Sequence, residues 1–77
     1  REVRFHLELE ELSPRALQQL VAVLGAQRGG CKSRMILTSE GVFEAEFLLP
    51  DWPVEPSPRL EESIQALFER PGIVALA

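Results

Sequence analysis

Few side chains in this chain could do chemistry, and His6 is the first to consider because it is the single histidine. In the predicted sheet, Glu44 or Glu46 lies across from it on the neighbouring strand. An imidazole and a carboxylate so placed could share a metal ion or a proton. The simpler interpretation is a polar pair on a solvated sheet face, and we prefer it. His6, Glu44 and Glu46 are therefore kept as candidate metal ligands, while the expectation is that no metal and no cofactor is bound.

Cys31 is the one cysteine, so no disulfide can form within the chain. A catalytic thiolate needs a neighbouring base or a positive local field, and only Lys32 and Arg34 lie close to it in sequence. Gly29 and Gly30 follow an expected helix, whereas phosphate-binding loops precede one, so we interpret them as a loop. No two carboxylates have settings that would separate their pKa values for acid–base catalysis. We therefore predict that the domain is not an enzyme.

Length and charge narrow the class of protein further. With 77 residues and a net charge of −4, the chain forms one small domain and is a poor match for nucleic acid. No apolar run approaches the ~20 residues needed to span a bilayer. The sequence begins with Arg1 and ends in an apolar stretch, so we expect a single domain over residues 1–77, excised from a longer protein. Any membrane attachment would then come from a missing upstream region.

Hydrophobic periodicity predicts six elements that must position these side chains, in the order β-α-β-β-α-β. Serine followed by proline marks two helix starts, because the hydroxyl caps a free N–H and proline needs no donor at the first helical position. Ser39-Glu40-Gly41 reads as a hairpin turn. The expected elements are a strand over 1–10, a helix from Ser13 to about Gly25, strands over 31–38 and 42–49, a helix from Ser57 to Arg70, and a strand over 73–77.

From this order we predict a ferredoxin-like α+β fold, with a four-stranded antiparallel sheet of order 4-1-3-2 and both helices on one face. The first strand is then central and lies beside the third, and residues 31–38 form an edge strand. We expect Phe5, Leu7, Phe43 and Phe47 to face the helices and build the core. The opposite sheet face carries Arg4, His6, Glu8, Glu44 and Glu46.

Three residues are candidates for contact with a ligand or a partner: Trp52, Lys32 and Arg34. Lys32 and Arg34 suit an edge strand, where charge discourages unwanted pairing. Trp52 stands in a proline-rich segment over 50–56, and aromatic residues are frequent anchors at interfaces. The alternative is that Trp52 folds back and covers the open end of a small core.

The element order resembles that of ACT-like regulatory domains. The last helix and strand, with Leu60-Glu61, Ile64, Leu67, Pro71-Gly72-Ile73 and Ala75, more closely resemble the cytoplasmic C-terminal domain of the MgtC/SapB family of membrane proteins. The resemblance implies a non-catalytic regulatory or protein-interaction domain, linked to magnesium stress and tethered to the inner membrane through upstream segments. It also implies a cytoplasmic location and either a protein partner or self-association as a homodimer. It implies no catalytic or metal-binding residues.

The alternative implied by the ACT resemblance is an amino-acid sensor that binds its ligand between paired domains. The ligand would lie near Leu12 to Arg15 and the start of the second strand. In the amino-acid-binding members, a glycine after the first strand lets the ligand approach the first helix. This chain has no glycine between Glu10 and Pro14, and the interaction domain is therefore our first hypothesis.

Overall fold

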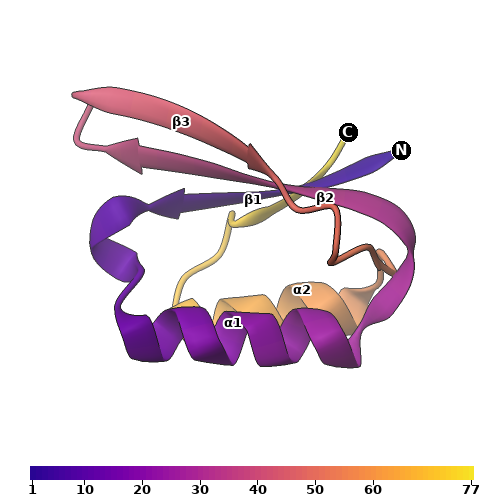
Figure 1. Cartoon of the computed structure of the whole chain (residues 1–77). Coiled ribbons are helices and arrows are strands. Elements are labelled where there is room, and N and C mark those ends of the chain that lie inside the picture. The colour runs from indigo at the N-terminus through magenta and orange to yellow at the C-terminus, as the bar shows by residue number, and fades with distance from the viewer.

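Four strands form one sheet, and two helices cover one of its faces (Figure 1). The computed structural model describes all of residues 1–77. The predicted α+β class and the β-α-β-β-α-β order of strands and α-helices are therefore confirmed. The elements are β1 (Glu2–Glu8), a 3-10 turn η1 (Leu9–Glu11), α1 (Pro14–Ala26), β2 (Arg28–Ser39), β3 (Phe43–Leu48), α2 (Pro58–Phe68) and β4 (Val74–Leu76).

The sheet has the order β3-β2-β1-β4 and is mixed, because β1 and β2 run parallel while the outer pairs are antiparallel. The predicted order 4-1-3-2 and the wholly antiparallel sheet are wrong. The first strand is central, but it lies beside the second strand and not the third. The strand predicted at the edge, residues 31–38, is an inner strand whose apolar run Met35–Leu37 is buried. The unbroken apolar run Met35–Leu37 was the signal, since an inner strand is shielded by neighbouring strands on both sides and by the helices on one face.

Both helices begin at the predicted serines. The backbone N–H of Ala16 donates to Ser13 Oγ at 3.1 Å, and that of Leu60 donates to Ser57 Oγ at 3.2 Å. Each cap satisfies one of the free donors of a first helical turn. The helix ends are less well predicted, because α1 continues past Gly25 and α2 stops before Arg70.

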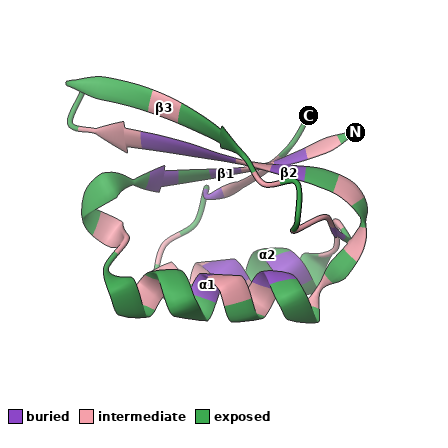
Figure 2. Ribbon diagram, in the orientation of Figure 1, coloured by how far each residue is buried: buried purple, intermediate pink, exposed green.

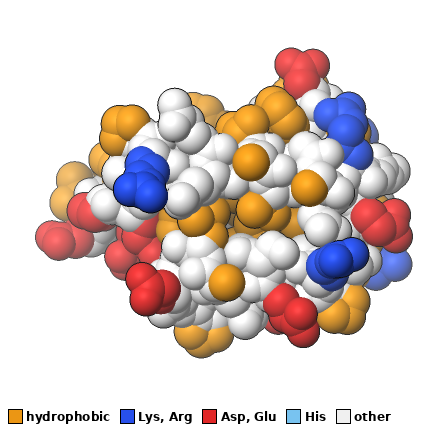
Figure 3. All heavy atoms as spheres, turned by 90° about the horizontal axis from the view of Figure 1, so that it is seen from below, with side chains coloured by type: hydrophobic (Ala, Val, Ile, Leu, Met, Phe, Trp, Pro, Cys, Tyr) orange, Lys and Arg blue, Asp and Glu red, His pale blue; other side chains and the backbone are white.

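The core lies between the helices and the inner strands, where Phe5 and Leu7 of β1 are almost fully buried, as predicted. Phe43 and Phe47 were also predicted there, but they are 43% and 48% exposed. They lie on the predicted face, yet on an edge strand that the helices do not cover. Seen from the helix side, charged side chains lie mainly toward the rim and apolar side chains are visible across the middle (Figure 3).

The proline-rich segment closes one end of the core and pairs with the start of β2. Gly29 N–H donates to Pro53 O at 3.2 Å, and Glu55 N–H donates to Gln27 O at 2.8 Å. Val54 is fully buried between these two bonds. The loop predicted at Gly29 and Gly30 is therefore wrong, because β2 begins at Arg28. Neither helix is both long and apolar enough to cross a membrane.

Candidate functional site

The exposed apolar side chains of one edge strand form the most unusual surface of the molecule. We call it the β3 surface. It comprises β3 and the turn residue before it, and β3 is exposed over nearly its whole length (Figure 2). Val42 is 81% exposed and Leu48 is 52% exposed, beside the two phenylalanines. Small proteins usually cover or charge such an edge, because open strand edges and apolar patches promote association.

The register with β2 assigns each β3 side chain to a sheet face. Phe47 is paired with Met35 and Ala45 with Leu37, and both partners belong to the core, so these β3 residues point to the helix side. Phe43 shares that side because side chains alternate along a strand. The intervening residues Glu44, Glu46 and Leu48 point to the open side of the sheet. The β3 surface therefore has an aromatic face and an open face with two carboxylates followed by Leu48, and we call the open face the acidic face.

A small ion-pair network borders the acidic face. Glu2 accepts from Arg4 Nε at 2.8 Å and from Arg34 Nε at 2.9 Å, and Arg34 Nη1 also reaches Glu46 at 3.3 Å. The hydrogen bonds from Arg4 and Arg34 lower the pKa of Glu2 below its ordinary value. The hydrogen bond and the charge of Glu2, followed by those of Glu46, raise the pKa of Arg34. Glu44 forms no ion pair and remains the free charge of the β3 surface.

Lys32 and Arg34 were assigned to an edge strand, and this placement is wrong because β2 lies between β1 and β3. Lys32 is exposed, while Arg34 is half-buried and held by two carboxylates. Any contact that either residue makes with a partner would therefore use the open sheet face and not a free edge. Their role as contact residues stays a prediction.

The strand order also separates the candidate metal ligands. Ile36 of β2 is the register partner of both His6 and Glu46, so it stands between them. His6 and Glu46 were expected to be neighbours on adjacent strands, but a whole strand separates them. No group of three or more His, Cys, Asp and Glu side chains is close enough to hold a metal ion. Cys31 is half-buried and packs against the core.

Trp52 packs against the core, as the alternative interpretation of this residue expected. Its carbonyl accepts a hydrogen bond of 2.6 Å from Ser33 Oγ, the one buried polar side chain. Its ring lies beside the last turn of α1, where a Cβ on Gly25 would be 3.6 Å from the indole atom Cζ3. The side chain remains partly exposed, and a contact with a partner stays a prediction.

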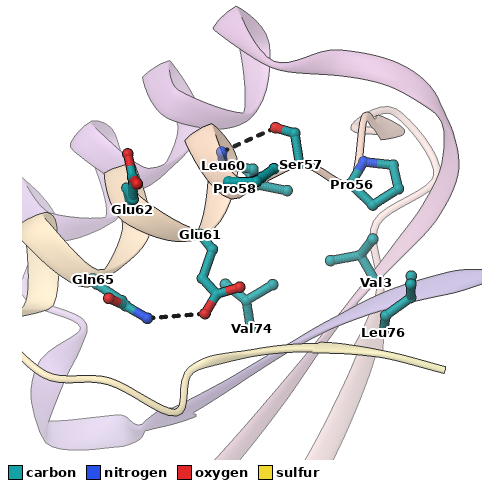
Figure 4. Close-up of a pocket in the computed structure, with 10 residues that line it drawn as sticks. All are labelled: Val3, Pro56, Ser57, Pro58, Leu60, Glu61, Glu62, Gln65, Val74 and Leu76. Carbon is teal, nitrogen blue, oxygen red and sulfur yellow. Dashed lines mark hydrogen bonds between the residues drawn. The ribbon is translucent and has the colours of Figure 1, made fainter.

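A second feature is a cavity of about 520 Å³ between the start of α2 and the strands β1 and β4 (Figure 4). Val3, Val74 and Leu76 form its strand side. The carboxylate of Glu61 extends from α2 toward β4 and accepts a hydrogen bond of 3.1 Å from Gln65 Nε2. The cavity therefore combines an apolar wall with one oriented carboxylate, a combination that suits small-molecule sites. Sequence reasoning did not find it, because its walls come from distant segments.

The ligand position implied by the ACT resemblance, residues 12–15, does not line this cavity. The junction after β1 is instead closed by Arg70, which donates to both carboxylate oxygens of Glu11 at 2.7 Å. The hydrogen bonds from Arg70 hold the pKa of Glu11 below its ordinary value. Arg70 also donates to His6 O at 3.0 Å and so ties the end of α2 to β1.

Comparison with protein-family models, with curated proteins and with solved structures found no match to this chain. The candidate sites therefore rest on the geometry of the chain itself.

Proposed function

We propose that this domain is a non-catalytic regulatory or protein-interaction domain that works through its β3 surface. The single observation behind the proposal is an uncovered edge strand that exposes two phenylalanines. An open edge offers backbone donors and acceptors, and the rings offer apolar area. Such a combination is a frequent site for protein partners.

The exposed apolar area is large enough to matter for binding. Phe43 and Phe47 each leave nearly half of their surface in water. Covering both rings would contribute on the order of 4 kcal/mol before the costs of association are subtracted. Since neither ring is needed to complete the core, this free energy is available to a partner or to a second copy of the domain.

The resemblance to the MgtC/SapB family extends the proposal. In this form, the chain is the cytoplasmic C-terminal domain of an MgtC-like membrane protein and transmits or receives regulatory contacts there. The helix-to-strand segment with Leu60, Ile64 and Pro71-Gly72-Ile73 supports it. The sequence upstream tests it: several apolar segments of spanning length would support a membrane parent. An upstream dehydrogenase, kinase or DNA-binding pattern would contradict this form of the proposal.

The experiment that tests the interaction role is site-specific photocrosslinking in the cells that produce the protein. A photoreactive amino acid replaces Phe47, and a control replaces Arg59 on the exposed side of α2. We expect a discrete protein adduct, to a partner or to a second copy, from position 47 only. An equal pattern at both positions, or no adduct at 47, would argue against an interaction role for β3.

The cavity beside α2 supports a second candidate function, a small-molecule sensor of the ACT type. Its test is thermal unfolding of the domain against the twenty amino acids and against Mg²⁺, Ca²⁺ and Zn²⁺. A ligand at 100 times its Kd adds about 2.7 kcal/mol of stability, which moves the midpoint of so small a domain by roughly 10 °C or more. A shift that is lost in Leu76→Trp, which places a larger side chain in the wall of the cavity, would favour the sensor. A flat screen would leave the interaction role as the supported function.

A further inference from the structure

We propose that the β3 surface accepts an extended strand of another protein in which basic and apolar residues alternate, so that the strand extends the sheet as its fifth member. This inference rests on the proposed interaction role and adds the chemistry of the partner. It follows from the free edge, from the two faces of β3 and from the cost of pairing β3 with itself.

The free edge determines the geometry of binding. β3 is the first strand in the order β3-β2-β1-β4 and is paired on one side only. A peptide that adds to such an edge gains affinity from main-chain hydrogen bonds and specificity from alternate side chains. The turn before β3 is short, since Glu40 and Gly41 take left-handed conformations and Val42 N–H donates to Ser39 O at 2.6 Å.

The two faces of β3 specify the side chains of the added strand. In a sheet, residues opposite one another on adjacent strands share a face and contact each other. An added strand therefore places every second side chain beside Phe43, Ala45 and Phe47, where apolar residues are stabilised. The intervening side chains lie beside Glu44 and Glu46, where Lys or Arg is favoured. A strand of alternating apolar and basic residues meets both requirements.

A second copy of the chain would meet these two side-chain requirements poorly. If two copies joined their β3 edges about a two-fold axis, the two β3 strands would run antiparallel. The two registers that pair most of Phe43–Leu48 are centred on Ala45 or on Glu46. The first places Glu44 opposite Glu46 of the second copy, and the other places Glu46 opposite its own equivalent. Like charges directly opposite one another are destabilising. The net charge of −4 on each chain adds a further repulsion.

The charges already present indicate where the basic residue matters most. Glu46 is partly neutralised by Arg34 at 3.3 Å, whereas Glu44 has no ion pair. Glu44 is paired in register with the neutral Thr38. The position opposite Glu44 therefore carries the strongest preference for Lys or Arg in the added strand.

The probe is a capped hexapeptide of alternating lysine and valine, titrated into the isotope-labelled domain and followed by amide chemical shifts. We expect one peptide per domain, with shifts confined to residues 42–49 and their β2 neighbours. A peptide of the same sequence with N-methyl groups on alternate residues keeps the charge and removes backbone donors, and it should not bind. If both peptides bind equally, the contact is only electrostatic and the strand-addition proposal is overturned.

Two matched double variants separate the acidic face from net charge. Glu44→Gln with Glu46→Gln should weaken the hexapeptide about fivefold or more at low salt. Glu55→Gln with Glu69→Gln makes the same change of charge elsewhere and should leave the affinity unchanged, since both residues are exposed, form no ion pair and lie outside β3. Equal weakening by both double variants would overturn the proposal.

Sedimentation of the free domain distinguishes a failure of the strand-addition inference from a failure of the interaction role. A monomer whose β3 edge binds the hexapeptide supports the inference. A dimer that buries β3 overturns the inference, yet it leaves the interaction role standing. If position 47 also gives no crosslink in cells, the interaction role itself fails.

Discussion

At position 29 the neighbouring backbone leaves no room for any side chain, so glycine is required there. A Cβ at this position would lie 2.6 Å from both the N and the Cα of Glu55, which is closer than real contacts allow. Gly30, next in the same strand, has nothing within 4 Å of the corresponding position. Close approach of two backbones, and not turn formation, therefore explains glycine at position 29.

This difference gives a matched pair of variants. Gly29→Ala must push the proline-rich segment away from β2, and it should cost about 1–3 kcal/mol of unfolding free energy. Gly30→Ala should change that free energy by less than about 0.5 kcal/mol. Urea unfolding of both variants measures the difference. Equal stabilities would mean that the segment over 53–55 does not pack on β2 in solution.

The ion pair between Glu11 and Arg70 predicts how stability depends on pH. Because hydrogen bonds from Arg70 lower the folded-state pKa of Glu11, the pair stabilises the fold above the unfolded-state pKa of about 4.3. That contribution is lost as the pH falls through the lower folded-state pKa. Glu11→Gln should therefore cost about 1 kcal/mol near pH 7, with the difference from the parent shrinking below about pH 4.

Thermal unfolding between pH 7 and pH 3 checks this dependence. Glu62→Gln serves as the control, since Glu62 is exposed and forms no ion pair. The control should follow the parent at every pH. A constant penalty for Glu11→Gln over the whole range would show that its effect is not the ionised pair.

At the scale of the element, β3 has the residue pattern of a core strand, but no helix packs over it. Its aromatic residues alternate as a half-buried strand requires, but α1 and α2 lie over the inner strands and leave β3 at the edge. Phe5 on β1 has the same residue type and is fully buried. Two strands with similar patterns therefore contribute very differently to stability.

Substitution of these phenylalanines tests the distinction. Phe43→Ser and Phe47→Ser, each made singly, should lower the unfolding free energy by about 1–2 kcal/mol, because nearly half of each ring is already in water, whereas Phe5→Ala should lower it by about 3–5 kcal/mol. Chemical unfolding provides both values. A loss as large as that of Phe5→Ala in either single variant would place that ring in the core and remove the surface on which the proposed function depends.

For the whole molecule, the strand order predicts which amides resist hydrogen exchange. β1 and β2 are each paired on both sides, so their amides should be protected along the strand. β3 has one free edge, and amides that point outward from it should exchange early. Residue-resolved exchange measures this pattern. Continuous protection over residues 43–48, with alternating protection over 32–38, would instead indicate the order 4-1-3-2.

The sequence by itself was sufficient for features whose causes are local. The caps at Ser13 and Ser57, the turn at Ser39-Glu40-Gly41 and the buried face of β1 depend on neighbouring residues, and each was predicted correctly. The central position of the first strand was also predicted, although its partner was not.

Only the tertiary structure decided which strands are neighbours. Alternation assigns a side chain to a face, but it does not say whether anything covers that face or which strand lies beside it. The exposure of Phe43 and Phe47, the separation of His6 from Glu46 and the inner position of Lys32 all follow from placing β2 between β1 and β3. The cavity beside α2 likewise needs Val3, Glu61 and Leu76 to meet in space. Long-range pairing of this kind is set by the combined burial of several elements, and no single segment of the sequence contains that information.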